Sequence, residues 1–423
     1  MKKLLFILLL TIPFVGFGQG WEKNYGGIDI DEGNSVQQTT DGGYIVCGHT
    51  NSFGQTPGDI YIIKTNSQGD TLWTKTFRFG FGYTLGNSIQ QTIDGGYIIC
   101  GSMDNNNLFT EGLLLKIDGG GNEQWWKNIN YISTGMSVKQ TFDGGYVVTG
   151  FGGKLIKSDS QGDTVWTKTL STNVTFIGYS VQQTIDSGYV ICGKTNDDSS
   201  TNNDNLFLIK TNSQGDIIWS KIFGDTTDYK LGYSVKQTND SGYIICGRTN
   251  DDLFLLKTDS QGDSLWIRTF GGVNKDIGYS VQQTNDGGYI ITGVKNWLVN
   301  SVGDSSKVWL IKTDGFGNYQ WDKTFGGLYT NIGKSVQQTS DGGYIVCGTF
   351  MKGGSGNGIW DVYLIKTDGN GNITSTFNIP TPSSNRNLEK IVDILGRETK
   401  PQTNTPFIEI YDDGTVEKKI VVE

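Results

Sequence analysis

Side chains able to do nucleophilic or metal chemistry are scarce in this chain. His49 is its single histidine, and the cysteines are Cys47, Cys100, Cys192, Cys246 and Cys347. Catalytic triads, histidine-activated thiols and histidine-rich zinc sites need several such groups close together. We therefore expect no catalytic residues of these kinds, and we expect His49, which lies beside a variable loop, to be a surface residue.

The cysteines all occupy one position of a repeat, and two further copies have Thr149 and Thr292 there. Equivalent positions of successive repeat units are too far apart for disulfide geometry. A site that accepts both cysteine and threonine is typical of a small, buried strand position. We expect these thiols to be structural and unpaired.

The other side chains able to take part in catalysis or metal binding are carboxylates, of which the chain has 43 (Asp and Glu). Many lie in turns such as DSQGD at 259–263, which bring two carboxylates and several carbonyls together, as calcium sites do. The spacing does not match an EF-hand loop, and turn geometry alone favours Asp and Gly at these positions. We expect ordinary turns, without metal or cofactor. A pair of loop carboxylates acting as acid and base stays open, and would make the protein a secreted carbohydrate-active hydrolase or lyase.

The phrase SVQQT-x-DGGYI-x-CG occurs seven times, and the fold that this repeat predicts determines where these residues lie. Each copy also carries an apolar FLIKT-like run and an acidic turn, and W-x-K segments recur with the same period. Successive copies lie 43 to 55 residues apart, a period typical of propeller blades that cannot bury their faces alone. The tyrosines of the phrase are Tyr44, Tyr97, Tyr146, Tyr189, Tyr243, Tyr289 and Tyr344.

One unit predicts a four-stranded antiparallel meander, with strands at 280–284, 289–293, 308–313 and 321–325 joined by tight turns and one loop. A W-x-K segment at Trp21 precedes the first phrase, and none follows the last acidic turn. We therefore expect an all-β, seven-bladed β-propeller of four-stranded blades, closed when Trp21–Tyr25 adds the outermost strand of the last blade. An open solenoid is the alternative, and it would need dissimilar capping repeats.

The meander assigns the connections to two faces of the ring. The DGG and acidic turns share one face, while the connections of variable length and content share the other, where recognition is usually found. Aromatic residues in or beside these variable loops are the tentative ligand-binding residues, for a glycan or a protein. The alternative is that they only pack the loops onto the blades. They are Trp297, Trp309, Trp360, Tyr229 and Tyr329.

The two ends of the chain differ from the repeats. Residues 1–18, with Lys2, Lys3 and a short apolar run, are typical of a signal peptide. The propeller is expected over 19–377, followed by a Pro/Ser linker at 378–387 and a β-rich segment at 388–423. The net charge of −9 argues against nucleic-acid binding, and we expect no transmembrane segment after signal removal.

The segment 388–423, with KIVDILGRETK, FIEIYDDG and a terminal VEKKIVVE, resembles the C-terminal (type A) sorting domain of type IX secretion cargo. It lacks the longer upstream half that many such domains have. The resemblance implies the type IX secretion machinery as a partner, and secretion or display on the outer cell surface after export through the signal peptide. The residues that carry it include Asp393, Gly396, Arg397, Tyr411, Gly414, Glu417 and Lys418.

The units themselves resemble the DGGY repeats of exported bacterial propeller proteins. That resemblance implies location and shape, since a fold does not fix a function. The sequence therefore favours an exported, non-enzymatic propeller that binds a glycan or a protein through its variable-loop face. A structural component of the cell surface is a further alternative.

Overall fold

The computed structural model divides into two compact units, Met1–Thr374 and Ser375–Glu423. The expected signal peptide lies outside the described residues, as does all of the expected linker except Asn387. No helix in the described part of the chain is long and apolar enough to cross a membrane. The structure describes residues 20–423 except 56, 106–108, 171–174, 197–203, 225–228, 298–305, 354–358, 374–386, 394–396, 403–404, 406, 412–415 and 420–423.

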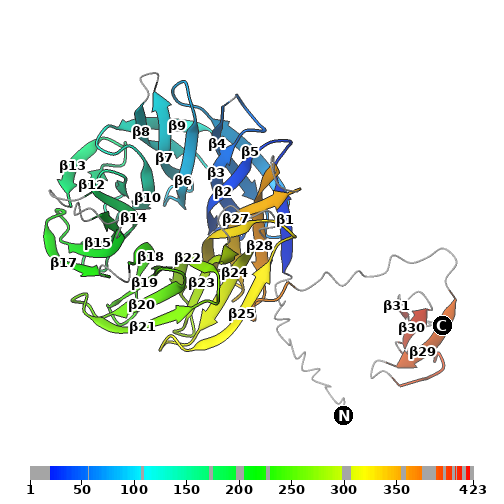
Figure 1. The fold of residues 1–423 in the computed structure, drawn as a ribbon. Helices are drawn as coiled ribbons and strands as arrows, with labels where there is room; N and C mark the ends of the chain where they lie inside the picture. The colour runs from blue at the N-terminus through cyan, green and yellow to red at the C-terminus, as the bar shows by residue number, and fades with distance from the viewer. Residues whose placement is uncertain are drawn as a thin grey trace, which may run out of the picture. The chain divides into compact units, whose positions relative to one another are not determined.

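The first unit is a ring of seven four-stranded antiparallel sheets (Figure 1). The innermost strands are β2 (Asp31–Gln38), β6 (Thr84–Gln91), β10 (Gly135–Gln140), β14 (Thr175–Gln183), β18 (Leu231–Gln237), β22 (Lys275–Gln283) and β26 (Asn331–Gln338). The second strands are β3 (Tyr44–Thr50), β7 (Tyr97–Asn105), β11 (Tyr146–Gly150), β15 (Tyr189–Asn196), β19 (Tyr243–Arg248), β23 (Tyr289–Trp297) and β27 (Tyr344–Lys352).

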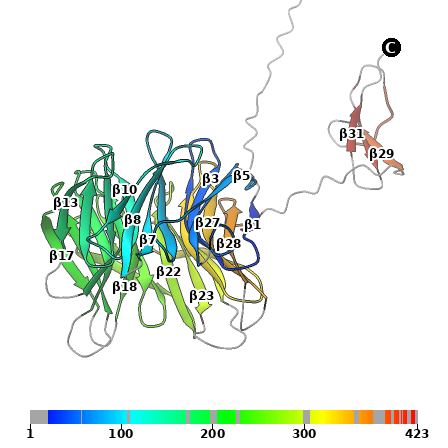
Figure 2. The ribbon, with the colours of Figure 1, turned by 90° about the horizontal axis from the view of Figure 1, so that it is seen from above.

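The outer half of each blade completes the meander. The third strands are β4 (Asp59–Thr65), β8 (Phe109–Ile117), β12 (Lys154–Ser158), β16 (Asp204–Thr211), β20 (Leu253–Thr258), β24 (Lys307–Thr313) and β28 (Ile359–Thr367). The outermost strands are β5 (Thr71–Phe77), β9 (Glu123–Ile129), β13 (Thr164–Thr169), β17 (Ile217–Phe223), β21 (Ser264–Phe270), β25 (Tyr319–Phe325) and β1 (Trp21–Tyr25). We number the blades one to seven from β2, and Figure 2 shows them edge-on.

The seventh blade has the strand order β1-β28-β27-β26, so β1 is its outermost strand. The register runs from Trp21 opposite Lys366 to Tyr25 opposite Val362. This confirms the predicted closure, in which strands from both ends of the unit share one sheet and remove an exposed edge. The innermost strands are longer than predicted, since residues before the constant serine pair with the second strand across a bulge, as at Gly278 and Ser280.

Burial follows the place of each strand in the blade. Every residue of β4 is buried because both faces of a middle strand pack on neighbouring blades. The five cysteines lie unpaired in second strands, each buried. Apolar clusters fill the spaces between blades; one joins Cys192 and Leu208 of blade four to Val235 and Tyr243 of blade five.

The constant SVQQ phrase is explained by hydrogen bonds between blades. Its serine hydroxyl accepts a backbone N–H of the next innermost strand, as Ser35 accepts from Ile89 at 3.3 Å, and this bond recurs seven times around the ring. Its second glutamine accepts from the DGG turn of the preceding blade, as Gln338 accepts from Asn285 at 2.8 Å. The side chains of the phrase therefore connect each blade to its neighbours by hydrogen bonds.

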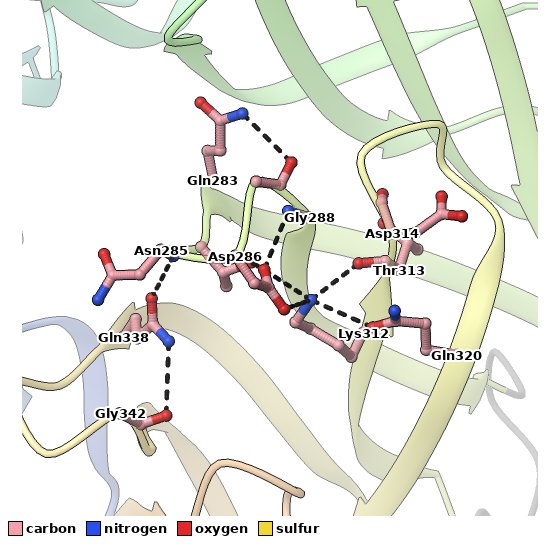
Figure 3. A network of polar contacts seen from close by, with 12 residues as sticks. Gln283, Asn285, Asp286, Gly288, Lys312, Thr313, Asp314, Gln320, Gln338 and Gly342 are labelled. Carbon is pink, nitrogen blue, oxygen red and sulfur yellow. Dashed lines mark hydrogen bonds and ion pairs between the residues drawn. The ribbon is translucent and has the colours of Figure 1, made fainter.

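A buried lysine on each third strand holds the DGG turn of its own blade. In blade six, Lys312 Nζ lies 2.8 Å from an Asp286 carboxylate oxygen and also donates to the Thr313 carbonyl oxygen, as Figure 3 shows. Asp286 also accepts the N–H of Gly288, which fixes the turn. All seven blades repeat this ion pair at 2.8 to 3.0 Å, with each lysine at most 6% exposed.

The second unit holds an antiparallel three-stranded sheet. Its strands are β29 (Leu388–Asp393), β30 (Phe407–Tyr411) and β31 (Val416–Lys419), in that order. Val392 and Phe407 are buried in it. The expected small C-terminal β unit is therefore present, while its sorting role stays a prediction.

Candidate functional site

A cavity of about 530 Å³ lies between blades five and six. The outermost strand β21 supplies Arg268 and Phe270, and β25 supplies Tyr319 and Asp322. Strands β23 and β24 add Lys295 and Trp309. The cavity thus combines aromatic walls with three charged side chains, within the volume range of ordinary ligand pockets.

Asp322 is the centre of a hydrogen-bond network in this cavity. Its carboxylate accepts from Trp309 Nε1 at 2.7 Å, from the Tyr319 hydroxyl at 2.7 Å and from Lys295 Nζ at 3.1 Å. Lys295 Nζ also lies 4.6 Å from the Trp309 ring centroid, a cation–π distance. Four side chains from three strands therefore fix one another's positions.

The network sets the charge of the cavity. Desolvation raises the pKa of Asp322, but the bonds from Trp309, Tyr319 and Lys295 and the charge of Lys295 outweigh it, so the net pKa is lowered. The hydrogen bond to this carboxylate, with some burial, raises the pKa of Tyr319. Near neutral pH Asp322 is an anion and Tyr319 a neutral donor.

These residues depart from the repeat. Trp309 stands where two blades have tyrosine and two have phenylalanine, and it is only 5% exposed because it also packs in the apolar cluster between blades five and six. An acid at the position of Asp322 recurs only in blade seven, as Glu22, which accepts from the Tyr363 hydroxyl at 2.5 Å. The other blades have Thr74, Trp126, Thr167, Ser220 and Ile267 there.

The described lining of the cavity offers groups that can recognise a polar ligand. Among its described lining residues Asp322 is the single carboxylate, whereas acid–base glycosidase chemistry uses two. Arg268 stacks on Trp266, with its guanidinium carbon 5.4 Å from the ring centroid, and donates to the Ile267 carbonyl oxygen. The lining offers two cations, one anion, a phenol and aromatic surface to a polar ligand.

The structure brings one of the five predicted aromatic residues, Trp309, into this cavity. Trp297 lies half-buried at the end of β23, and Trp360 lies half-buried in β28 opposite Met351. Tyr229 donates to the Asn250 carbonyl oxygen at 3.0 Å, and Tyr329 is half-buried before β26. The predicted residues therefore do not converge on one site.

The residues expected to form the sorting signal lie in the second unit. Arg397 Nη2 lies 2.8 Å from the Asp393 carboxylate, and the Arg397 backbone N–H donates to the same group at 3.0 Å. The Tyr411 hydroxyl donates to Glu409 at 2.6 Å. In the register of the sheet, Glu417 and Lys418 of β31 face Glu409 and Ile408; Gly396 and Gly414 lie outside the described residues.

The acidic turns use their carboxylates locally. Asp259 accepts the backbone N–H groups of Gln261 and Asp263, each at 2.9 Å, which is the geometry of an ordinary Asx turn. Asp263 pairs with Lys221 of the preceding blade at 2.7 Å. These bonds account for the Asp residues of the repeat by turn geometry and blade contact.

Sequence reasoning overlooked the inner rim of the ring. The residue before the constant serine is bulged on the innermost strand, and it varies from blade to blade. In blades four to six it is tyrosine, and the rings of Tyr179, Tyr233 and Tyr279 contact one another in series at 5.1 Å. Its variability beside constant residues was the signal that could have identified it.

His49 is less exposed than predicted. It is half-buried at the end of β3 opposite Glu32 of β2, rather than on the open surface. Burial lowers its pKa, and the charge of Glu32 opposes that effect. His49 is within the blade because β2 begins at Asp31, before the constant serine, and pairs with the end of β3.

Solved WD40 propellers are similar to this chain in fold. The WD40 propeller domain of Doa1 is 14% identical with a TM-score of 0.52, covering 83% of this chain and 97% of that one. The WD40 repeats of RRP9 are 12% identical with a TM-score of 0.54, covering 81% and 96%.

A protein of unknown function from Dyadobacter fermentans is 11% identical with a TM-score of 0.50, covering 82% of this chain and 97% of that one. A scan of protein-family models and a search of curated proteins each gave no match. At these identities the similarity concerns fold alone, which is that of a WD40-like, seven-bladed β-propeller.

Proposed function

We propose that this protein is an exported, non-enzymatic binding propeller that holds a saccharide in the cavity between blades five and six. The observation that carries the proposal is the network in which Asp322 fixes Trp309, Tyr319 and Lys295 around a cavity of about 530 Å³. Binding energy comes from apolar and aromatic surface, and orientation from a few fixed polar groups. A sugar ring presents hydroxyl groups for the latter and C–H faces for the former.

The charges of the cavity favour an acidic saccharide. Arg268 and Lys295 supply two cations, while Asp322 supplies one anion that already accepts three hydrogen bonds. A carboxylate on the sugar would find a guanidinium able to bind it through two parallel hydrogen bonds. Tyr319, whose side chain is largely exposed, borders the opening and adds a phenol ring.

Preorganisation supports binding over a merely structural role. The positions equivalent to Asp322 hold threonine, serine, isoleucine or tryptophan in five other blades, which complete the same four-stranded sheet. A carboxylate, an indole, a phenol and an ammonium group brought together are therefore not needed to build a blade. Local departures of this kind from a repeat are expected where function is placed.

A glycan array that includes neutral and uronic-acid oligosaccharides tests the proposal. We expect the wild-type protein to bind acidic glycans and Asp322→Asn to bind about 10- to 100-fold more weakly, because one or two fixed hydrogen bonds are lost. Glu22→Gln is the matched control, since it changes the equivalent acid of blade seven and should leave binding intact. Equal binding by wild type and Asp322→Asn, or no binding of any glycan, would contradict the proposal.

Export completes the proposed function. The leader at 1–18 would direct passage across the inner membrane, and the segment 388–423 would engage the type IX secretion machinery. The Asp393–Arg397 pair supports this, since it joins two of the residues that carry the resemblance. A saccharide-binding propeller delivered this way would act outside the cell or on its surface.

A further inference from the structure

Two lysines interrupt a ring of glutamines on the innermost strands. The first glutamine of SVQQ is present in five blades, whereas Lys139 of β10 and Lys236 of β18 replace it in blades three and five. In the five blades its Oε1 accepts the backbone N–H of the next innermost strand at 2.6 to 2.9 Å. The five acceptors are Gln37, Gln90, Gln182, Gln282 and Gln337.

An ammonium group cannot take over this role, because it has three donors and no acceptor. The backbone N–H groups of Gln183 and Gln283 therefore lose the acceptor that their counterparts have. Neither Lys139 nor Lys236 has a hydrogen bond or an ion pair among the described residues. By contrast, the rim lysine Lys334 pairs with Glu32 at 2.6 Å and donates to Asn34 at 2.8 Å.

The two lysines have the same place in their blades. Both are half-buried and lie on innermost strands, which line the centre of the ring. Burial, followed by the charge of Lys236, lowers the pKa of Lys139 to about 7, and burial lowers that of Lys236. Lys236 and the buried Cys100 thiol act on Lys139, and the buried Cys192 and Cys246 thiols act on Lys236, with no carboxylate among these groups.

Such an arrangement is costly for folding. Two like charges with incomplete hydration repel each other, and glutamine at the same position gives a satisfied hydrogen bond. The chain carries a net charge of −9 and supplies an aspartate to the buried lysine of every third strand, yet within the described part of the chain neither of these two lysines has an ion-pair partner. A local cost of this kind is expected at a binding site.

We propose that Lys139 and Lys236 bind an oxyanionic group, a phosphate or a carboxylate, at the centre of the ring. One such group offers several oxygen acceptors and at least one negative charge, so it would satisfy donors of both ammonium groups and remove their repulsion. Blade four separates the two lysines, and its glutamine, Gln182, is already bonded to Gln237. The site is separate from the saccharide cavity of blades five and six and does not depend on it.

The repeat itself supplies the variants that test this inference. Lys139→Gln, Lys236→Gln and the double variant introduce the residue of the other five blades, so the ring is expected to fold. Without added anion, the double variant should melt at the same temperature as wild type or higher. Each single variant should still show an anion-induced rise in melting temperature, smaller than that of wild type. This graded loss would show that the double variant fails to respond because both lysines are gone, and not because it is misfolded.

The probes are inorganic phosphate and succinate, with sodium chloride at matched ionic strength as the reference, in thermal melts and calorimetric titrations. We expect one or both to raise the melting temperature of wild type by several degrees at millimolar concentration, as ligand binding to the folded state requires. The double variant should not respond, and Lys334→Gln should respond like wild type.

A response to phosphate alone would identify the group as a phosphate, and a response to succinate alone would identify a carboxylate. No response to either probe, or the same shift in wild type and the double variant, would overturn the proposal.

Discussion

The indole of Trp21 lies edge-on against the phenol ring of Tyr44, with 5.8 Å between ring centroids and 67° between the ring planes. Trp21 belongs to the outermost strand of blade seven and Tyr44 to the second strand of blade one. Six other tryptophan–tyrosine pairs join successive blades at 5.8 to 6.2 Å. The contact at Trp21 is thus the seventh of a series, and it closes the ring by joining blade seven to blade one.

Trp21→Ala should destabilise the propeller by about 2–4 kcal/mol, because large aromatic truncations leave a cavity and Trp21 also donates to the Ser67 carbonyl oxygen at 3.2 Å. Denaturant unfolding followed by tryptophan fluorescence measures the loss. Trp126→Ala is the control: Trp126 is 40% exposed and follows Trp125, which makes the repeated contact in blade two. An equal effect of the two substitutions would contradict a special role for the closing contact.

Asp286→Asn should cost about 1–3 kcal/mol, because it leaves the ammonium of Lys312, whose side chain is 3% exposed, without its counter-charge. The matched control is Asp263→Asn, whose partner Lys221 lies at the surface, and it should cost no more than about 0.5 kcal/mol. Chemical denaturation at pH 7 compares the two. Similar losses would show that burial of the lysine is not what makes the pair important.

Acid should unfold the ring through these turns. Desolvation raises the pKa of Asp41 and Asp286, but hydrogen bonds from lysine, threonine and glycine and the lysine charge lower both to about 2. A carboxylate with a lowered folded-state pKa contributes stability above its unfolded value near 4 and loses it as the pH falls toward 2. The melting temperature should therefore fall steeply between about pH 4 and pH 2. Asp286→Asn should show a shallower fall, and parallel curves would refute this origin.

Ser241→Gly should stabilise the protein by about 0.5–1 kcal/mol. The DGG turn needs a positive φ at its first glycine, such as 82° at Gly287, and blade five adopts φ of 65° with serine instead. Glycine accepts this conformation without the steric penalty of a β-carbon. Ser260→Gly, in the neighbouring acidic turn, should give no gain, because the positive φ of that turn is at Gly262 and not at Ser260. Thermal melts of the two variants distinguish them.

The fold followed from the sequence because the repeat is governed by local rules. Constant DGG turns, apolar runs of strand length and the unmatched tryptophan strand at Trp21 fixed blade number, strand order and closure together. Each of these signals is read within one unit or by comparing units. No long-range contact had to be guessed.

The candidate site could not be found this way. Asp322 stands three residues beyond Tyr319 and is 27 residues from Lys295, and its partnership with Trp309 depends on side-chain direction in the folded blade. Loop variability pointed to five aromatic residues, while the cavity is built mainly from strand residues. Lys139 and Lys236 lie within a constant phrase, and the consequence of the Gln-to-Lys change appears only once the hydrogen bonds of the other five glutamines are seen in the ring.

Deleting residues 388–423 should stop the protein from reaching the outer surface. The resemblance of this segment to type IX cargo signals, together with its own three-stranded sheet, predicts that the truncated propeller folds but stays in the periplasm. Cell fractionation and surface labelling in a bacterium with this secretion system measure the outcome. Arg397→Ala, which breaks the pair with Asp393, should impair delivery, and Lys400→Ala should not. Because the propeller is a separate compact unit, its melting temperature should be unchanged by the deletion, so normal surface delivery of the truncated chain would refute the sorting role rather than report misfolding.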